Sequence, residues 1–316
     1  MDKINWYPGH MKKTRELIQS NMKMVDLVIE VIDSRIPVAS RNPVISELIG
    51  SKPEIIVLNK KDLSDKAETD AWIRKLTAGN VTAIPCDCES GAGTSRLMEE
   101  LSKANEKRNS TKKWDRPLRM MIVGVPNVGK SSLINRLTRR KAAKTGDRPG
   151  VTKGKQWMTL ENGMQLLDTP GILWPNIEDQ EHGRHLAYCG SIKDEIYDIS
   201  DLCLEFLKFM LKEHREMLYG RYKLDPPAAS EEQEEEDSIW GTDDTSGSCG
   251  DGVTPVSENG EYTPLGAMEE IARKRGFIMP GKRIDYERCA RTVLDEFRSG
   301  MIGRITLEHS QEHGDD

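Results

Sequence analysis

The sequence predicts a three-layer α/β domain followed by a small all-helical C-terminal domain. Over the first part of the chain, short apolar runs that end in polar residues alternate with helical patterns, which is typical of a parallel sheet covered by helices on both faces. After about Asn176 the strand pattern stops, and apolar residues recur at helical spacing. We therefore expect one domain at residues 1–177 and a second at residues 178–316.

Five segments have the pattern of buried parallel strands, because each is a short and nearly continuous apolar run. These are Leu27–Asp33, Ile55–Leu58, Val81–Pro85, Arg119–Val123 and Gln165–Asp168. Helical patterns of the first domain lie at His10–Met24, Asp65–Thr77, Thr94–Lys107 and Ser131–Arg139. In the second domain they lie at Ile199–Tyr219, Leu265–Arg275 and Tyr286–Phe297.

The composition favours a globular protein of the cytoplasm. Of 316 residues, 36% are hydrophobic, and no run approaches the length of a membrane span. The first residues lack the apolar region of a signal peptide, so we expect a cytoplasmic protein that does not contact a membrane. We also expect a monomer. The six cysteines form no Cys-x-x-Cys pair, which favours reduced thiols over a metal or redox site.

An acidic segment masks a mildly basic protein. From Pro226 to Glu261 there are eleven Asp or Glu and no Lys or Arg, so the rest of the chain carries +5 although the net charge is −6. A segment this polar cannot bury enough surface to offset the entropy of ordering, and we expect an acidic, disordered insert at about 226–262. The basic remainder weakly favours a polyanionic partner.

The segment Gly124–Ser131 matches the pattern Gly-x-x-x-x-Gly-Lys-Ser/Thr, between a predicted strand and a predicted helix. Its glycines let backbone N–H groups turn toward phosphate oxygens, and the helix N-terminus adds positive potential. We expect Lys130 to reach the β- and γ-phosphates and the Ser131 hydroxyl to bind Mg²⁺. The predicted phosphate-contacting residues are Asn127, Val128, Gly129, Lys130, Ser131 and Ser132.

Two later segments are predicted to respond to the γ-phosphate. In Asp168-Thr169-Pro170-Gly171, we expect Asp168 to hold the magnesium shell and the Gly171 N–H to contact the γ-phosphate. Between the two motifs, Thr152 is our candidate for the switch threonine that closes on magnesium.

A base-reading motif, Asn59-Lys60-Lys61-Asp62, follows the second predicted strand. The carboxylate of Asp62 can accept from N1–H and the exocyclic amine of guanine, a donor pair that adenine lacks, so the motif favours GTP over ATP. The side chain of Asn59 can approach the other edge of the base, and the stem of Lys60 can lie along its ring. A further base contact is expected after the next strand from Asp87 and Cys88, mainly through backbone N–H groups.

The order of these motifs is permuted, because Asn59–Asp62 precedes the phosphate loop, whereas in ordinary small GTPases it comes last. Permutation preserves a site when chain termini lie close together. The chain resembles the circularly permuted ribosome biogenesis GTPases, specifically ribosome biogenesis GTPase A, over nearly its whole length. The resemblance rests on Asn5–Met11, Asn59–Asp62, Gly124–Ser132, Pro149–Thr152, Asp168–Gly171 and the ending Gly303–Glu308.

The resemblance implies a GTPase that assists late assembly of the large ribosomal subunit, binds ribosomal RNA, and is slow alone but stimulated by the subunit. Two features depart from the family's pattern: the acidic insert, and Asp87-Cys88 where Asn-Ser is usual. Positive charge supports RNA contact, with nine Lys or Arg against four acids between Ile271 and Arg304. A GTPase of another RNA pathway, such as tRNA modification, and a GTP-gated binding module with negligible turnover are the alternatives.

Hydrolysis needs a polar group that orients the attacking water. Many GTPases place Gln directly after Asp-x-x-Gly, but here that position is Ile172, which cannot hydrogen-bond water. The resemblance implies His10 as the substitute. The alternative is a potassium ion near Asn127, as in related GTPases with Pro-Asn at this point of the loop.

Overall fold

The computed structural model describes residues 10–111, 116–138, 156–169, 179–225, 256 and 261–311, without the side chains of residues 10–14, 17, 111 and 156. The chain forms two compact units. One contains Met1–Tyr197 together with Arg298–Asp316, and the other contains Asp198–Phe297. The boundary expected after residue 177 therefore falls inside the first unit, which also receives the last residues of the chain.

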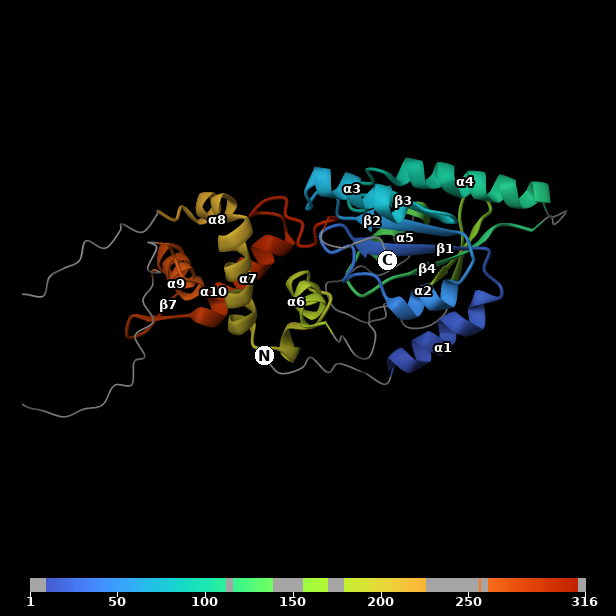
Figure 1. Cartoon of the computed structure of the whole chain (residues 1–316). Helices are drawn as coiled ribbons and strands as arrows, with labels where there is room; N and C mark the ends of the chain where they lie inside the picture. Colours follow the sequence, from blue (N-terminus) through green and yellow to red (C-terminus); the bar gives the residue numbers. More distant parts are fainter. Residues whose placement is uncertain are drawn as a thin grey trace, which may run out of the picture. The chain divides into compact units, whose positions relative to one another are not determined.

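A six-stranded sheet with the order β3-β2-β1-β4-β6-β5 lies at the centre of the first unit (Figure 1). Neighbouring strands from β3 to β6 are parallel, and only β5 runs antiparallel to its neighbour β6. The strands are β1 (Leu27–Asp33), β2 (Glu54–Asn59), β3 (Val81–Pro85), β4 (Arg119–Val123), β5 (Gln156–Thr159) and β6 (Gln165–Asp168). All five predicted strands are confirmed, and β5 is an addition at the edge.

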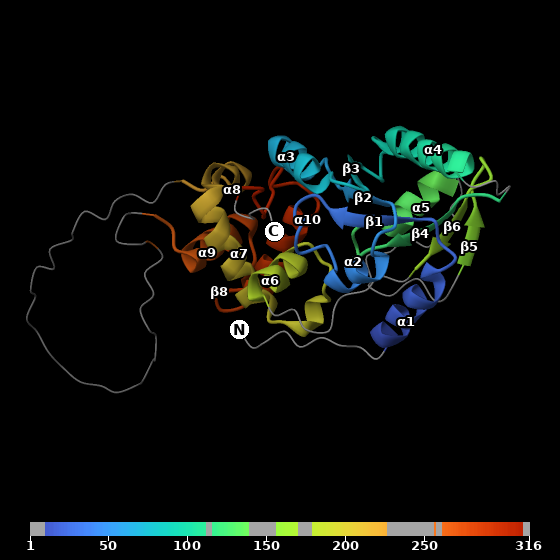
Figure 2. The ribbon, with the colours of Figure 1, turned by 45° about the vertical axis from the view of Figure 1, so that its right-hand side comes forward.

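Helices cover both faces of this sheet. The helices of the first unit are α1 (His10–Met22), α2 (Pro43–Ile49), α3 (Lys66–Leu76), α4 (Thr94–Thr111), α5 (Lys130–Thr138) and α6 (Gln180–Tyr188), with a short 3-10 turn at Asp194–Ile196; α6 is not counted among those that cover the sheet. Figures 1 and 2 show α1 and α2 on one side of the sheet and α4 on the other. The predicted three-layer α/β architecture is therefore confirmed.

Local sequence signals explain where two of these helices begin. The side chain of Asn42 accepts from Val44 N at 3.0 Å, directly before Pro43 at the first helical position of α2. The side chain of Asp65 accepts from Glu68 N at 2.9 Å and caps α3. Because α3 starts at this cap, it fixes the end of the loop that follows β2.

Two apolar clusters hold the layers together. One joins Ile18 of α1 and Ile45 of α2 to Val28 of β1 and Met121 of β4. The other joins β1, β2 and β3 to α3 through Trp72, which is 2% exposed. The strands are therefore rigidly supported, and the carboxyl ends of the parallel ones meet at one edge, where α/β sheets bind ligands.

The described part of the second unit is largely helical. It contains α7 (Ile199–Glu213), α8 (Arg215–Tyr222), α9 (Pro264–Arg275), α10 (Tyr286–Arg298) and a short hairpin of β7 (Ile278–Met279) and β8 (Arg283–Ile284). The single helix predicted at 199–219 is two helices, because the chain leaves the helical conformation at His214. The rings of Phe206 and Phe297 pack in a tilted arrangement in its core, with 4.8 Å between their centroids. Within the described ranges, no helix is long and apolar enough to cross a membrane.

Candidate nucleotide-binding site

The phosphate loop connects β4 to α5 and lies at the carboxyl edge of the sheet. Gly124 has φ of +145°, and a Cβ there would collide with the carbonyl oxygen of Val31 in β1. Gly129 has φ of +99°, and a Cβ there would collide with the side-chain amide of Asn59. Both glycines are therefore required by close approach as well as by backbone conformation.

Lys130 is the first residue of α5 and is only 8% exposed. Its ammonium group donates to the carbonyl oxygens of Gly124 (3.0 Å) and Val125 (2.7 Å) in its own loop. Burial lowers the pKa of Lys130 to about 8, although the charge of Asp168 opposes that change. A buried ammonium inside a ring of backbone groups is poised to meet a polyanion.

The side chain of Asn59, at the end of β2, joins three segments. Its amide NH₂ donates to Val128 O in the phosphate loop at 2.7 Å, and its amide oxygen accepts from Cys88 N at 2.9 Å. The side chain is buried. Asn59 therefore brings together the base-reading motif, the phosphate loop and the segment after β3.

The segment after β3 differs in detail from the prediction. The N–H of Asp87 donates to Ala92 O at 2.8 Å, and the N–H of Cys88 donates to Asn59. Both backbone donors expected to contact the base are thus engaged within the protein. Burial raises the pKa of Asp87, but hydrogen bonds from Ser90 and Glu89 lower it more, so the carboxyl pKa lies below its usual value.

Lys60 and Lys61 continue the base-reading motif. Lys60 has φ of +61°, and its ammonium forms an ion pair with Asp33 at 2.9 Å. Lys61 N donates to Cys86 O at 3.2 Å, which ties the loop after β2 to the loop after β3. Asp62 follows with an exposed side chain.

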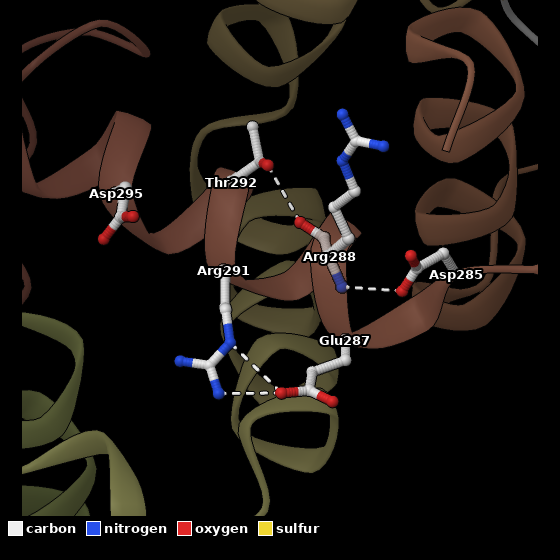
Figure 3. A pocket seen from close by; sticks show the side chains of 6 residues that line it. All are labelled: Asp285, Glu287, Arg288, Arg291, Thr292 and Asp295. Atoms are coloured by element: carbon white, nitrogen blue, oxygen red, sulfur yellow. Dashed lines mark hydrogen bonds and ion pairs between the residues drawn. The ribbon is translucent and has the colours of Figure 1, made fainter. Parts of the chain in front are cut away.

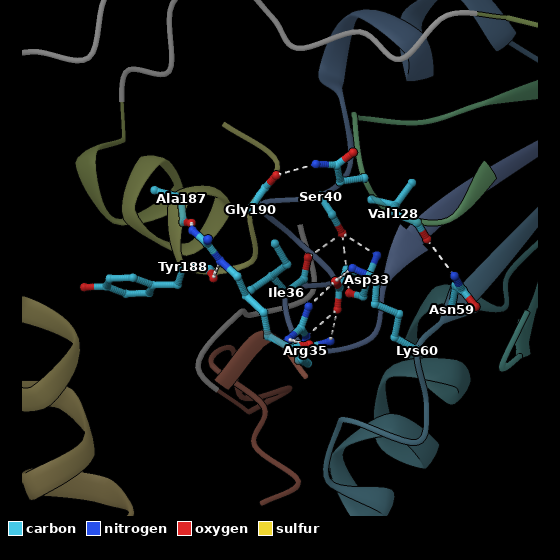
Figure 4. A network of polar contacts seen from close by, with 12 residues as sticks. Asp33, Arg35, Ile36, Ser40, Asn59, Lys60, Val128, Ala187, Tyr188 and Gly190 are labelled. Carbon is cyan, nitrogen blue, oxygen red and sulfur yellow. Dashed lines mark hydrogen bonds and ion pairs between the residues drawn. The ribbon is translucent and has the colours of Figure 1, made fainter. Parts of the chain in front are cut away.

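Asp33, at the end of β1, is the centre of a buried charge cluster that the sequence did not reveal (Figure 4). Arg35 donates to both carboxylate oxygens, at 3.0 and 2.8 Å. Burial would raise the pKa of Asp33, but the charges of Arg35 and Lys60 outweigh it and hold that pKa well below its ordinary value. This fixed anion orients Lys60 and so shapes the base-reading loop.

Two of the three residues predicted to hold magnesium, Ser131 and Asp168, lie at the same edge. Asp168 ends β6, pairs in register with Ile122 of the neighbouring β4, and is buried. The hydroxyl of Thr169 donates to Ile122 O at 2.6 Å and fixes this strand end. Ser131 is the second residue of α5. A hydroxyl and a carboxylate are hard oxygen ligands, so both residues fit Mg²⁺.

Asn127 is bonded to the loop that follows α6. It has φ of +60°, and its side-chain NH₂ donates to Gly190 O at 2.7 Å. Because a carbonyl accepts this bond, the NH₂ of the amide faces Gly190 and its oxygen faces the opposite way. The contact connects the phosphate loop to a segment about sixty residues later in the chain.

Four predicted positions are not placed. Thr152, Gly171 and Ile172 lie outside the described residues, and so does the side chain of His10, whose backbone begins α1. Val128, Gly129 and Ser132 occupy the loop and the first turn of α5 as predicted.

A surface pocket of about 320 Å³ lies elsewhere, in the second unit along α10 (Figure 3). Its polar groups bond locally: Arg291 pairs with Glu287 at 2.8 Å, and the backbone N–H of Arg288 donates to the carboxylate of Asp285 at 3.0 Å. It contains none of the predicted nucleotide-site residues.

Comparisons with known proteins agree with these motifs. A family model described as "50S ribosome-binding GTPase" matches residues 119–220. Ribosome biogenesis GTPase A of Bacillus cereus is 39% identical, with 99% of this chain and 96% of that protein covered. The chain belongs to the ribosome biogenesis GTPase A family.

Other members and relatives of the family extend over both compact units. Ribosome biogenesis GTPase A of Priestia megaterium is 38% identical, covering 98% of each chain. Mitochondrial ribosome-associated GTPase 1 of Mus musculus is 33% identical, covering 97% of this chain and 90% of that protein. The crystal structure of GNP-bound YlqF from T. maritima superposes with a TM-score of 0.59 at 26% identity, covering 95% of this chain and 99% of that one.

Proposed function

We propose that this protein hydrolyses GTP as a switch in assembly of the large ribosomal subunit. The observation that carries the proposal is the position of Asn59, which bonds the phosphate loop on one side and the segment after β3 on the other. A base-reading motif joined to a phosphate loop is what guanine nucleotide binding requires. The ribosomal role follows from the names of relatives that cover nearly the whole chain.

Guanine binding depends on Asp62, whose two carboxylate oxygens accept from N1–H and the exocyclic amine. Lys60, held by Asp33, keeps its stem beside the base. The backbone N–H groups of Asp87 and Cys88 are already engaged, so we assign this segment a supporting role: it orients Asn59 rather than reading the base itself.

The phosphates lie against the loop from Asn127 to Ser132, with Lys130 on the β- and γ-phosphates. Ser131, Asp168 and Thr152 would hold Mg²⁺, which neutralises charge that develops on the phosphate oxygens. The burial of Lys130 supports this arrangement, because few water molecules compete with the phosphates for its charge.

Switching depends on Thr152 and the N–H of Gly171, which contact the γ-phosphate before hydrolysis and lose it afterwards. In this permuted chain, Gly171 is followed by α6 and then by the second unit. The chemical state of the nucleotide therefore has a short covalent path to the helical unit.

We assign orientation of the attacking water to His10, because Ile172 occupies the position where many GTPases have Gln and cannot hydrogen-bond water. The second candidate is a potassium ion at Asn127, and the fixed orientation of that amide supports it. In either case, slow turnover alone and stimulation by the ribosomal subunit follow, since a group from outside the phosphate loop must be positioned first.

The proposed partners are the large ribosomal subunit and its ribosomal RNA. The protein would bind them in the cytoplasm as a monomer. Exposed basic residues support RNA contact by the second unit: Arg273, Lys274, Arg275, Lys282, Arg283, Arg288 and Arg291. A role in another RNA pathway has no observation in its favour.

The base-reading assignment is tested with Asp62→Asn. Asparagine presents one acceptor and one donor, so the variant should bind guanine nucleotides more weakly and favour xanthine nucleotides, whose C2 oxygen accepts a hydrogen bond. Affinities of both proteins for GDP, XDP and ADP would be measured. An unchanged preference for GDP in the variant would show that Asp62 does not read the base.

A further inference from the structure

The last described residues of the chain return to the nucleotide-binding unit and pass between its loops. Residues 305–308 form a continuous buried stretch, in which Thr306 is 1% and Glu308 2% exposed. Burial of a threonine and a glutamate is unusual unless their polar groups are satisfied. The partners of these groups identify what the segment does.

Backbone bonds join this segment to two loops at the carboxyl edge of the sheet. Ile305 N donates to Leu63 O at 3.0 Å, in the loop after β2. Leu307 N donates to Arg35 O at 2.8 Å, in the loop after β1. Between them, Thr306 Oγ1 accepts from Asp65 N at 3.0 Å. Ile305 and Thr306 therefore bond the loop after β2, and Leu307 bonds the loop after β1.

Glu308 is the anchor of the segment. Its carboxylate accepts from Ala39 N at 3.1 Å and contacts His185 Nδ1 at 3.0 Å. The same carboxylate also accepts from Val38 N, and its backbone oxygen accepts from Trp72 Nε1 at 2.9 Å. Removal of a buried carboxylate that accepts this many hydrogen bonds destabilises the fold, because each donor would be left unsatisfied.

The start of the segment is held as firmly. The guanidinium of Arg298 donates to the carbonyl oxygens of Ala187 (2.9 Å) and Tyr188 (3.0 Å) and to the carboxylate of Asp194 (2.8 Å). The segment is thus fixed at both ends, with the contacts to the base-reading loop between them.

The base-reading loop is consequently restrained on both sides of Asp62. On one side Asn59 is bonded to Val128 and Cys88. On the other side Leu63, the next residue after Asp62, and Asp65 are bonded to the returning segment. Without the second restraint, the loop after Asp62 would be held on that side only by its junction with α3 at Asp65.

We infer that the segment from Arg298 to Ser310 positions the Asp62 carboxylate and thereby sets the discrimination between guanine and other bases, with Thr306 and Glu308 as its positioning residues. The inference rests on the proposed function, because it assumes that Asp62 reads guanine. Since the segment directly follows α10 in the chain, base recognition is also covalently continuous with the helical unit.

The test measures affinities of the full-length protein for GDP and IDP. Inosine lacks the exocyclic amine, so IDP loses one of the two hydrogen bonds to Asp62, and the ratio of the two dissociation constants reports how well that carboxylate is placed. We expect the wild type to prefer GDP by about tenfold or more, because the lost bond involves a charged group. Thr306→Val removes the acceptor of Asp65 N and should reduce this ratio severalfold, and Glu308→Gln should do the same.

Controls separate positioning from stability. Thr306→Ser keeps the acceptor oxygen, so the ratio of its dissociation constants for GDP and IDP should equal that of the wild type. His309→Ala removes an ion pair of the same segment with Glu68 on α3 and should leave the ratio unchanged. Thermal unfolding of each variant shows whether it is folded, and Thr306→Val decides the question if Glu308→Gln does not fold.

These measurements distinguish a failure of the positioning role from a failure of the proposed function. If the wild type prefers GDP but folded Thr306→Val keeps the same ratio, including the case in which both affinities fall equally, the positioning role is wrong and the proposed function stands. If the wild type itself does not prefer GDP over IDP and ADP, the proposed function is wrong and this inference falls with it.

Discussion

The ammonium group of Lys130 is bonded to two carbonyl oxygens of its own loop and is nearly removed from water. Its pKa of about 8 means that, in the free protein, it loses its proton at mildly alkaline pH. Binding of phosphate groups favours the charged form, so nucleotide binding near this pH must be accompanied by proton uptake.

At pH 8 we expect uptake of about 0.5 proton per GDP bound, because a group is half protonated at its pKa. Calorimetric titration in buffers of different ionisation enthalpy measures this number directly. GDP affinity should correspondingly fall as pH rises above 8. Zero net uptake at pH 8 would show that Lys130 stays fully charged in the free protein.

His10 is the residue assigned to orient the attacking water. His10→Ala should lower subunit-stimulated GTP hydrolysis by about a hundredfold, typical of the loss of one positioned acid–base group, while GTP affinity stays nearly unchanged. Both quantities would be measured in potassium and in sodium buffers. Normal turnover by the variant, together with wild-type turnover silenced by sodium, would instead make a potassium ion at Asn127 the main catalyst.

At the scale of elements, the neighbouring strands β1 and β2 bury two carboxylates side by side. Glu30 and Glu54 are 0% and 6% exposed, and Arg41 bonds Glu30 at 2.9 Å and approaches Glu54 at 3.6 Å. One oxygen of each carboxylate has no hydrogen-bond partner in the described part of the chain. Burial, and then the charge of Glu30, raise the pKa of Glu54 to about 7.

A carboxyl whose pKa is raised on folding favours the folded state fully only below its unfolded pKa. That contribution is lost as pH rises through about 7. The side chain in Glu54→Gln is uncharged at every pH. The free energy of unfolding of this variant, relative to that of the wild type, should therefore increase by about 1–3 kcal/mol between pH 5 and pH 8. Urea unfolding at several pH values measures this. Glu47→Gln, at an exposed position of α2, is the matched control, and parallel curves for Glu54→Gln and the wild type would contradict the raised pKa.

The strands of the sheet were predictable because continuous apolar runs such as Leu27–Asp33 belong to strands buried on both faces. The edge strand β5 was missed, since four residues with mixed polarity carry little signal. The helix α2 was missed for a similar reason, being only seven residues long. The break at His214 was missed because the apolar spacing continues from α7 into α8.

Within the site, motif spacing predicted the loops that meet at the sheet edge, because each motif follows a strand whose carboxyl end lies there. It could not predict that Asn59 uses the N–H of Cys88, since backbone hydrogen bonds leave no mark on composition. Nor could it assign Glu308, which bonds Val38 and Ala39 about 270 residues earlier in the chain. Contacts at that distance depend on the folded path of the whole chain.

At the scale of the whole molecule, the chain crosses between its compact units twice, after Tyr197 and after Phe297. One segment bonded to the nucleotide site lies just before the first crossing, and another lies just after the second. Gly190, just before the first crossing, accepts from Asn127 of the phosphate loop. Ile305, just after the second, donates to the base-reading loop. Both the phosphate loop and the base-reading loop are therefore bonded to segments that continue directly into the helical unit.

The measurement that tests this account most directly is GTP turnover by the purified protein alone, with large ribosomal subunits, and with small subunits as the control. The account predicts slow turnover alone and a rise of about tenfold or more with large subunits only, because a group outside the phosphate loop must be positioned by the partner. Equal turnover under all three conditions would contradict a switch that acts on the large subunit.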